Sequence, residues 1–189
     1  MTEKDTYKTL TKASEEVLFK DKNSKFFGYA FPVISEDAVK IHLEALKKQH
    51  HSARHWCYAY QLGTQEEQYQ FRANDDGEPN NSAGMPIYGQ IQSFEVTNIL
   101  ISAYKTAAQM ALDHSKIVTR TINQDIQLKF EYKNMNKVMR IIKEKNLKVK
   151  SQTLELDCTI TISVRLKKTK DVLSAFEAIF GVGVKVLND

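Results

Sequence analysis

An acidic stretch in the first half of the chain carries the residue types best suited to chemistry. Asp75, Asp76 and Glu78 lie close together, with Gly77 between them and Pro79 after them. Carboxylate oxygens are the ligands that Mg²⁺ prefers, so one hypothesis is a cation site. The alternative is a tight turn in which Asp side chains accept hydrogen bonds from backbone N–H groups. Three acids on one loop make a poor metal cage, so we favour a structural or binding loop and expect neither a metal nor a cofactor.

A histidine and a cysteine stand upstream of this stretch. His55 and Cys57 begin an aromatic-rich segment, residues 55–62, which predicts a strand with both side chains on one face. A nucleophilic Cys–His pair also needs a third group that orients the histidine. The sequence indicates no residue for this orienting role, so we assign no catalytic residue. Cys57 is expected to be a small buried side chain. His55 is either a hydrogen-bonded structural histidine or a ligand for an anion, whereas His50 is expected in a solvated loop.

A row of basic residues in the second half is the other candidate. Apolar residues at spacings of three and four predict a helix over residues 132–142. Off this apolar stripe lie four basic residues: Lys133, Lys137, Arg140 and Lys143. Such cations suit salt-dependent binding of phosphates in RNA, and the alternative is an ordinary solvated face. The predicted strand at 156–166 turns Asp, Thr, Ser and Arg outward, so stacking of RNA bases on aromatic residues is not expected there.

The composition places these candidates in an ordinary globular protein. The 189 residues are 42% hydrophobic and 26% charged, which excludes the disordered and low-complexity classes. No apolar run approaches the roughly 20 residues of a membrane span, and the charged N-terminus lacks the apolar stretch of a signal peptide. The two cysteines, Cys57 and Cys158, lie far apart and indicate neither a disulfide framework nor a zinc ribbon. We expect a soluble cytoplasmic protein without a membrane partner.

The charge is divided unevenly between the two halves. Residues 1–117 hold 13 Lys and Arg against 15 Asp and Glu, whereas residues 118–189 hold 14 against 8. Such a difference predicts two domains, 1–117 and 118–189, and an acidic partner for the second.

The expected elements give an α+β protein. In the first half we predict strands at 17–20, 26–33, 55–62, 69–72 and 94–101, and helices at 35–49, 83–93 and 103–114, the first helix capped by Ser35. In the second half the order is β-α-β-β-α-β, with the strand at 156–166 alternating throughout, a helix capped by Thr169 and a last strand at 182–187. This order is that of the ferredoxin-like split βαβ fold.

Three segments together indicate a family. Residues 75–86 read DDGEPNNSAGMP, which resembles the DDGEP…AG-x-P signature of the Impact/YigZ family. Residues 24–30 (SKFFGYA) and 53–60 (ARHWCYAY) resemble its first strand and its A-x-H-x-C-x-A-Y strand. The resemblance implies a ribosomal protein S5 domain 2-like fold, followed by a ferredoxin-like domain similar to domain V of elongation factor G. We expect a binding surface in the first domain formed by His55, Asp75, Asp76, Gly77, Glu78, Pro79, Ser82, Ala83 and Gly84.

The sequence departs from the family at one joint. Family members carry a glycine-rich segment after the strand that matches residues 96–101, and this sequence has none. A predicted strand therefore runs directly into a helix, although such connections usually take about 2–6 residues. One hypothesis is that the protein has about 16 further residues between Ile101 and Ser102, which would make it longer and more basic. The alternative is a true deletion, and a normal peptide bond between the two residues would decide for it.

Two functions from different classes remain open. Eukaryotic members of the family regulate translation, so the first is a non-enzymatic binding protein that contacts RNA, the ribosome or a protein regulator of translation. The second is an enzyme that acts on a phosphorylated or nucleotide-like substrate at His55 and the acidic loop. The sequence gives no indication of oligomeric state.

Overall fold

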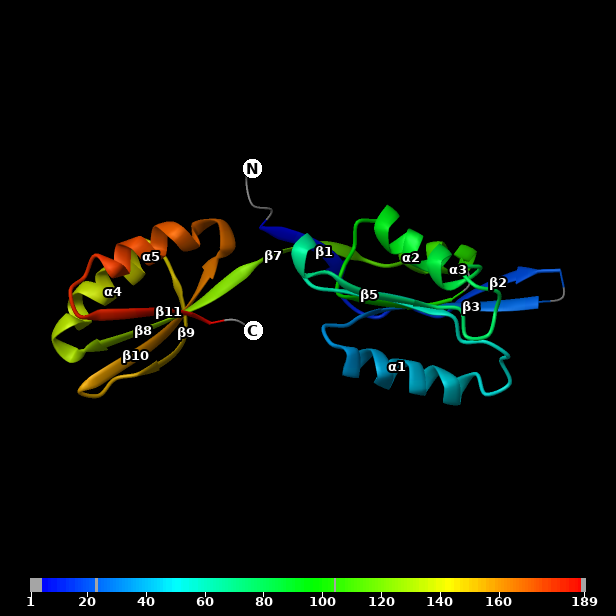
Figure 1. The fold of residues 1–189 in the computed structure, drawn as a ribbon, viewed down its shortest axis with the longest axis horizontal. Helices are drawn as coiled ribbons and strands as arrows, with labels where there is room; N and C mark the ends of the chain where they lie inside the picture. The colour runs from blue at the N-terminus through cyan, green and yellow to red at the C-terminus, as the bar shows by residue number, and fades with distance from the viewer. Residues whose placement is uncertain (1–4, 23, 104, 188–189) are drawn as a thin grey trace. The chain divides into compact units, whose positions relative to one another are not determined.

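The chain divides into two units, and each is described by itself. The computed structural model describes residues 5–22, 24–103 and 105–187 (Figure 1). The first unit is Thr6–Arg120, and the second contains Asp5 together with residues 121–187. The boundary that we predicted from charge, after residue 117, falls at the start of strand β7 (Ile117–Thr121).

The first unit is built on a five-stranded antiparallel sheet. Its strands lie in the order β2 (Val17–Asp21), β3 (Ser24–Pro32), β6 (Ile99–Ser102), β4 (Tyr58–Leu62) and β5 (Gln70–Asn74). Helix α1 (Glu36–Gln49) covers one face, and α2 (Gly84–Ser93) and α3 (Lys105–Asp113) cover the other (Figure 1). The unit also contains the short 3-10 helix η1 (Glu66–Gln68) and strand β1 (Thr6–Leu10), which pairs with β7.

The central strand β6 shows why this sheet is covered on both faces. Successive side chains of a strand point to opposite faces. Ile99 and Ile101 belong to the core beneath α2 and α3, whereas Leu100 packs with Val39 of α1. Ile99, Leu100 and Ile101 are completely buried, which explains why these three consecutive residues are all apolar. At the start of α1, Ser35 Oγ accepts a hydrogen bond from Ala38 N at 3.2 Å, which confirms the predicted cap.

The second unit has the predicted ferredoxin-like fold. Its elements follow the order β-α-β-β-α-β: β8 (Asn123–Glu131), α4 (Met135–Glu144), β9 (Lys148–Thr153), β10 (Asp157–Arg165), α5 (Thr169–Glu177) and β11 (Val182–Leu187), with 3-10 turns η2 (Tyr132–Asn134) and η3 (Leu166–Lys168). The antiparallel sheet has the strand order β11-β8-β10-β9. Thus the predicted α+β class and the predicted order of elements along the chain agree with the structure.

The alternating strand of the sequence is β10. Cys158, Ile160, Ile162 and Val164 are at most 1% exposed and pack beneath α4 and α5. The residues between them lie on the other face of the sheet. Asp5 is fixed to this unit because its backbone oxygen accepts from Ile122 N at 2.8 Å and its carboxylate accepts two N–H groups of Arg165.

Three expectations are wrong in detail. The strand predicted at 94–101 begins only at Ile99, because Glu95 and Asn98 have positive φ angles of 54° and 53° that interrupt an extended backbone. The strand predicted at 55–62 begins only at Tyr58. Thr169 does not cap α5: it is the first residue of the helix, and its hydroxyl has no hydrogen-bond partner among the described residues.

The hypothesis of additional residues after Ile101 is also wrong. Strand β6 continues through Ile101 into Ser102, and Ser102 pairs with both Tyr29 and Tyr58. An insertion of about 16 residues would interrupt a paired strand. The expectation of a longer and more basic protein, which depended on this insertion, is therefore wrong as well. Strand β6 ends at Ser102 and α3 begins at Lys105; Tyr104 lies outside the described residues.

In the described part of the chain, no helix combines the length and the apolar character needed to cross a membrane.

Candidate functional site

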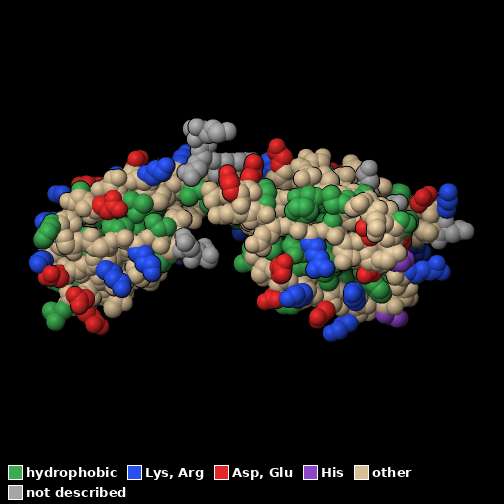
Figure 2. All heavy atoms as spheres, in the orientation of Figure 1, with side chains coloured by type: hydrophobic (Ala, Val, Ile, Leu, Met, Phe, Trp, Pro, Cys, Tyr) green, Lys and Arg blue, Asp and Glu red, His purple; other side chains and the backbone are tan. Residues whose placement is uncertain are grey.

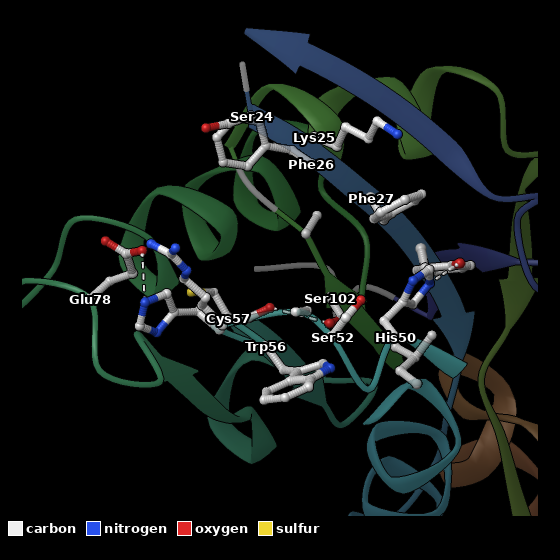
Figure 3. Close-up of a pocket in the computed structure, with 16 residues that line it drawn as sticks. Ser24, Lys25, Phe26, Phe27, His50, Ser52, Trp56, Cys57, Glu78 and Ser102 are labelled. Carbon is white, nitrogen blue, oxygen red and sulfur yellow. Dashed lines mark hydrogen bonds and ion pairs between the residues drawn. The ribbon is translucent and has the colours of Figure 1, made fainter. Parts of the chain in front are cut away.

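A cavity of the first unit lies beside the predicted acidic loop. It has a volume of about 710 Å³. Its walls come from the beginning of β3, the end of α1, residues 52–57, Glu78 and the end of β6 (Figure 3). Two of the three sequence motifs, residues 24–30 and 53–60, thus meet the acidic loop at one place in space.

Asp75 holds the acidic loop onto helix α2. One carboxylate oxygen, Oδ1, accepts from the backbone N–H groups of Ala83 and Gly84 at 2.9 and 2.8 Å, and Oδ2 accepts from Asn81 N at 2.9 Å. These hydrogen bonds, with Gly84 first, hold the pKa of Asp75 below its usual range. The first N–H groups of a helix have no partner within it. The methyl side chain of Ala83, the residue before α2, cannot accept a hydrogen bond from them. Asp75 therefore serves as a remote cap for α2, which is a structural role.

Replacing Asp75 with Asn is expected to destabilise the first unit at neutral pH. Because folding lowers the pKa of Asp75, its contribution is fully present above the unfolded value of about 3.9 and is lost as the pH falls through the lower folded value. The difference in urea midpoint between wild type and Asp75→Asn should therefore be largest near neutral pH and should narrow below pH ~4. A difference that stays constant down to the acid limit would contradict the role of this carboxylate.

Asp76 and Gly77 turn the loop back onto the segment that contains His55. Asp76 has a φ of 46° and Gly77 a φ of 91°. The turn brings Asp76 Oδ2 to Trp56 N at 2.8 Å and the Asp76 carbonyl oxygen to His55 Nδ1 at 2.7 Å. A side-chain Cβ at position 77 would lie 3.4 Å from His55 Nδ1. Gly77 thus serves both the left-handed backbone and the close approach of the imidazole ring.

Each ring nitrogen of His55 faces an oxygen atom of the acidic loop. Because a carbonyl oxygen only accepts, the proton of the bond to Asp76 O resides on His55 Nδ1. His55 Nε2 lies 3.4 Å from Glu78 Oε1. The structure therefore brings together His55, Asp76 and Glu78, three of the residues that we predicted to form a binding surface. Of the other predicted residues, Pro79 and Ser82 are exposed, while Ala83 and Gly84 are buried at the start of α2.

Cys57 is a protonated, buried thiol. Its Sγ donates to the carbonyl oxygen of Asp75 at 3.1 Å. Burial, followed by the nearby carboxylates of Glu78, Asp76 and Asp75, raises the pKa of Cys57 to about 11. A nucleophilic cysteine needs the opposite shift. The interpretation of Cys57 as a buried small side chain agrees with this geometry.

A second polar cluster at the cavity was missed by the sequence analysis. The hydroxyl of Tyr29 donates to the Glu16 carboxylate and accepts from Gln49 Nε2 at 3.0 Å, and His50 Nε2 lies 2.6 Å from the same oxygen. Since the only hydroxyl proton goes to Glu16, His50 Nε2 must be the donor. Burial and Glu16 raise the pKa of Tyr29, so the phenol stays neutral.

His50 is therefore not the solvated loop residue that we expected. It ends helix α1 and stacks on Phe27 with ring centroids 4.4 Å apart. The signal that sequence offered was the pair Phe27 and Tyr29 in the β3 motif, but their partner stands more than 20 residues downstream. The register between β3 and the end of α1 is a tertiary property.

Comparison with known proteins identifies the family of the chain. The family model described as the Impact N-terminal domain matches residues 22–124, more than half of the chain. The chain belongs to the Impact family. The matched region contains the whole cavity and both polar clusters apart from Glu16.

Two of three relatives of this Impact family chain match most of its length. IMPACT family member YvyE of Bacillus subtilis is 26% identical over 77% of this chain and 73% of its own. An IMPACT family member of Haemophilus influenzae is 24% identical over 82% of both chains, and YigZ of Escherichia coli is 30% identical over 44% and 42%. A crystal structure of a hypothetical protein superposes with a TM-score of 0.71 over 98% of each chain at 18% identity, which supports the two-unit fold alone.

The basic residues predicted for RNA lie outside the matched Impact domain, on the second unit. Lys133, Lys137, Arg140 and Lys143 are all exposed. Lys133 Nζ lies 2.9 Å from Glu131, and Arg140 Nε lies 3.7 Å from Glu144. Within the described residues, Lys137 and Lys143 have no ion pair. Figure 2 shows Lys and Arg side chains over this unit with acidic side chains among them.

The acidic residues of this Impact family chain do not gather around one point. Among the described residues, no three His, Cys, Asp or Glu side chains are grouped as cation ligands. Asp75 faces the start of α2, whereas Asp76 and Glu78 face Trp56 and His55.

Proposed function

We propose that this protein is a non-enzymatic, cytoplasmic binding protein that contacts the phosphate backbone of RNA in the regulation of translation. The observation that carries the proposal is the exposed basic row on α4 and the preceding turn. Two of its four members, Lys137 and Lys143, have no carboxylate partner among the described residues. The connection with translation comes from the resemblance to the Impact/YigZ family.

The geometry of the row suits a chain of phosphates. The four residues span ten positions, which corresponds to about 15 Å along a helix. Phosphate contacts position a nucleic acid without reading its sequence. The open face of the neighbouring sheet carries Thr159, Thr161 and Ser163 on β10 and therefore offers no aromatic platform on this strand for stacking bases.

The polar groups of the first unit support binding over catalysis. The Asp75 carboxylate is engaged by three backbone N–H groups, and the Cys57 thiol is protonated with a pKa of about 11. Both of these residues have structural partners that account for their positions.

The proposal is tested by RNA binding to the full chain at about 50 and 200 mM salt. Wild type is expected to bind a single-stranded RNA at the lower salt concentration and to lose affinity at the higher one. A variant with all four basic residues replaced by Gln should weaken binding and reduce the salt slope by about 2.8 at most, since each phosphate contact to a single strand contributes about 0.7.

A matched variant controls for the change in net charge. It replaces four exposed lysines of the first unit with Gln: Lys12, Lys20, Lys48 and Lys116. We expect this variant to retain the wild-type salt slope. No binding at low salt, or the same loss of slope in both variants, would contradict the basic row as the RNA contact and would favour a protein regulator as the partner.

A further inference from the structure

We propose that the cavity of the first unit binds a nucleoside phosphate, with the phosphate at Lys25 and Arg54 and the base against the aromatic wall. This site lies in the first unit and does not depend on RNA binding by α4. The chemistry is shared by a free mononucleotide and by one nucleotide of a single-stranded RNA.

The size and walls of the cavity suit such a ligand. Its volume of about 710 Å³ falls within the roughly 300–1,000 Å³ that is usual for small-molecule sites. In Figure 3 the indole of Trp56 lies on one side, with Ser24, Lys25, Phe26 and Phe27 of β3 on the other. The walls thus combine aromatic rings with cationic side chains.

The balance of charge in the cavity favours an anion. Lys25 and Arg54 line the cavity, are exposed, and make no ion pair with any described residue. The carboxylate of Glu78 already faces His55 Nε2 at 3.4 Å. Glu78 is the one acidic residue among the described residues that line the cavity, so the two cations outnumber the carboxylate. Arg in particular binds phosphate through paired N–H groups.

A second carboxylate near the cavity is also accounted for. Glu16 accepts from the Tyr29 hydroxyl and from Gln49 Nε2 at 3.3 Å, and it lies 3.7 Å from His50 Nε2. Glu16 is not among the residues that line the cavity, and these contacts direct its carboxylate toward Tyr29 and Gln49 rather than toward Lys25 or Arg54.

The aromatic wall and one hydrogen-bond donor favour a planar ring in addition to the phosphate. Phe26, Phe27 and Trp56 line the cavity, and bases stack on such side chains with little dependence on sequence. Trp56 Nε1 is buried and has no acceptor within the described residues. An indole nitrogen can only donate, and an unpaired buried donor is unfavourable. A ligand oxygen that reached Nε1 through a shift of the indole ring would supply the missing acceptor.

Trp56 also supplies the measurement, because it is the single tryptophan of the chain. The full chain is titrated with adenosine and uridine monophosphates, adenosine, inorganic phosphate and a short single-stranded RNA. Affinity is measured by equilibrium dialysis, and Trp56 fluorescence reports whether binding occurs at the cavity. Saturable binding of a monophosphate, tighter than that of adenosine or phosphate alone, is the expected result.

Three variants locate the ligand. Arg54→Gln and Lys25→Gln should each weaken binding about tenfold, since each removes a charge-assisted hydrogen bond. Trp56→Phe keeps an aromatic ring and removes the donor, so dialysis should show weaker binding. Lys48→Gln, at an exposed position of α1 outside the cavity, should bind like wild type.

The outcomes separate the two ligand sources and the two proposals. Binding of RNA that saturates the Trp56 signal and weakens in Arg54→Gln, without binding of mononucleotides, would support the site and identify the polymer as its source. Inorganic phosphate that binds as tightly as the nucleotides, or no saturable response to any probe, would overturn the inference. Loss of RNA binding in the α4 variant with an unchanged nucleotide response at Trp56 would show that the two sites are separate.

Discussion

Phe176→Ala is expected to lower the stability of the second unit by about 3–5 kcal/mol, the cost of removing a large buried aromatic side chain. Phe176 is completely buried beneath the sheet and belongs to the core formed with Val172, Ile160 and Ile162. Small domains are stable by only about 5–15 kcal/mol, so this one change removes a large part of the total. Urea unfolding followed by far-ultraviolet circular dichroism should show an early transition.

The control for Phe176 lies four residues away. Phe180 is 97% exposed, so Phe180→Ala should change stability by no more than about 0.5 kcal/mol. Trp56 lies in the first unit, whose cores are separate from that of the second, and its fluorescence transition should keep the wild-type midpoint in both variants. Equal losses in the two variants would contradict the packing of α5 onto the sheet.

Gly84→Ala is expected to destabilise the first unit by about 1–3 kcal/mol, the usual cost of overpacking. A Cβ at position 84 would lie 2.6 Å from the backbone nitrogen and 2.9 Å from the carbonyl carbon of Asn74. Because these are backbone atoms, relief requires α2 to move away from β5. That movement would also stretch the hydrogen bonds of Asp75 to Ala83 N and Gly84 N.

A second glycine of the same helix supplies the control. A Cβ at Gly89 would meet nothing within 4 Å, so Gly89→Ala should stabilise the helix by about 0.5–1 kcal/mol through the lower flexibility of the unfolded chain. Trp56 fluorescence in urea compares the two variants. If Gly84→Ala were stabilising as well, the close approach of α2 to β5 would be refuted.

Much of the fold could be predicted because each unit has strong local patterns. The alternation from Cys158 to Val164 identifies one buried strand face, and the order of elements around it permits few topologies. Ser35 caps α1 through its own side chain, a contact that spans only three residues. Patterns of this kind depend on the geometry of a single element, and the sequence contains all of it.

The joint after Ile101 shows how local rules can mislead. The rule for loop lengths was applied to a strand that was placed too early, at 94–101 rather than Ile99–Ser102. The apolar residues of the segment 94–101 do not indicate that Glu95 and Asn98 adopt positive φ angles. With the strand moved toward Ser102, the short connection to α3 needs no additional residues.

For the candidate site, the sequence determined the motif loop and its turn chemistry, while tertiary structure decided what the loop does. The sequence predicts a tight turn from Asp75, Gly77 and Glu78. Only the fold places Asp75 against the start of α2 and His55 against Asp76. The cluster of Tyr29, Glu16 and His50, and the unpartnered nitrogen of Trp56, had no counterpart in any local pattern. The reason is physical: such contacts depend on the register of β3 with its neighbours and on the packing of α1, which bring together side chains 13 to 21 residues apart.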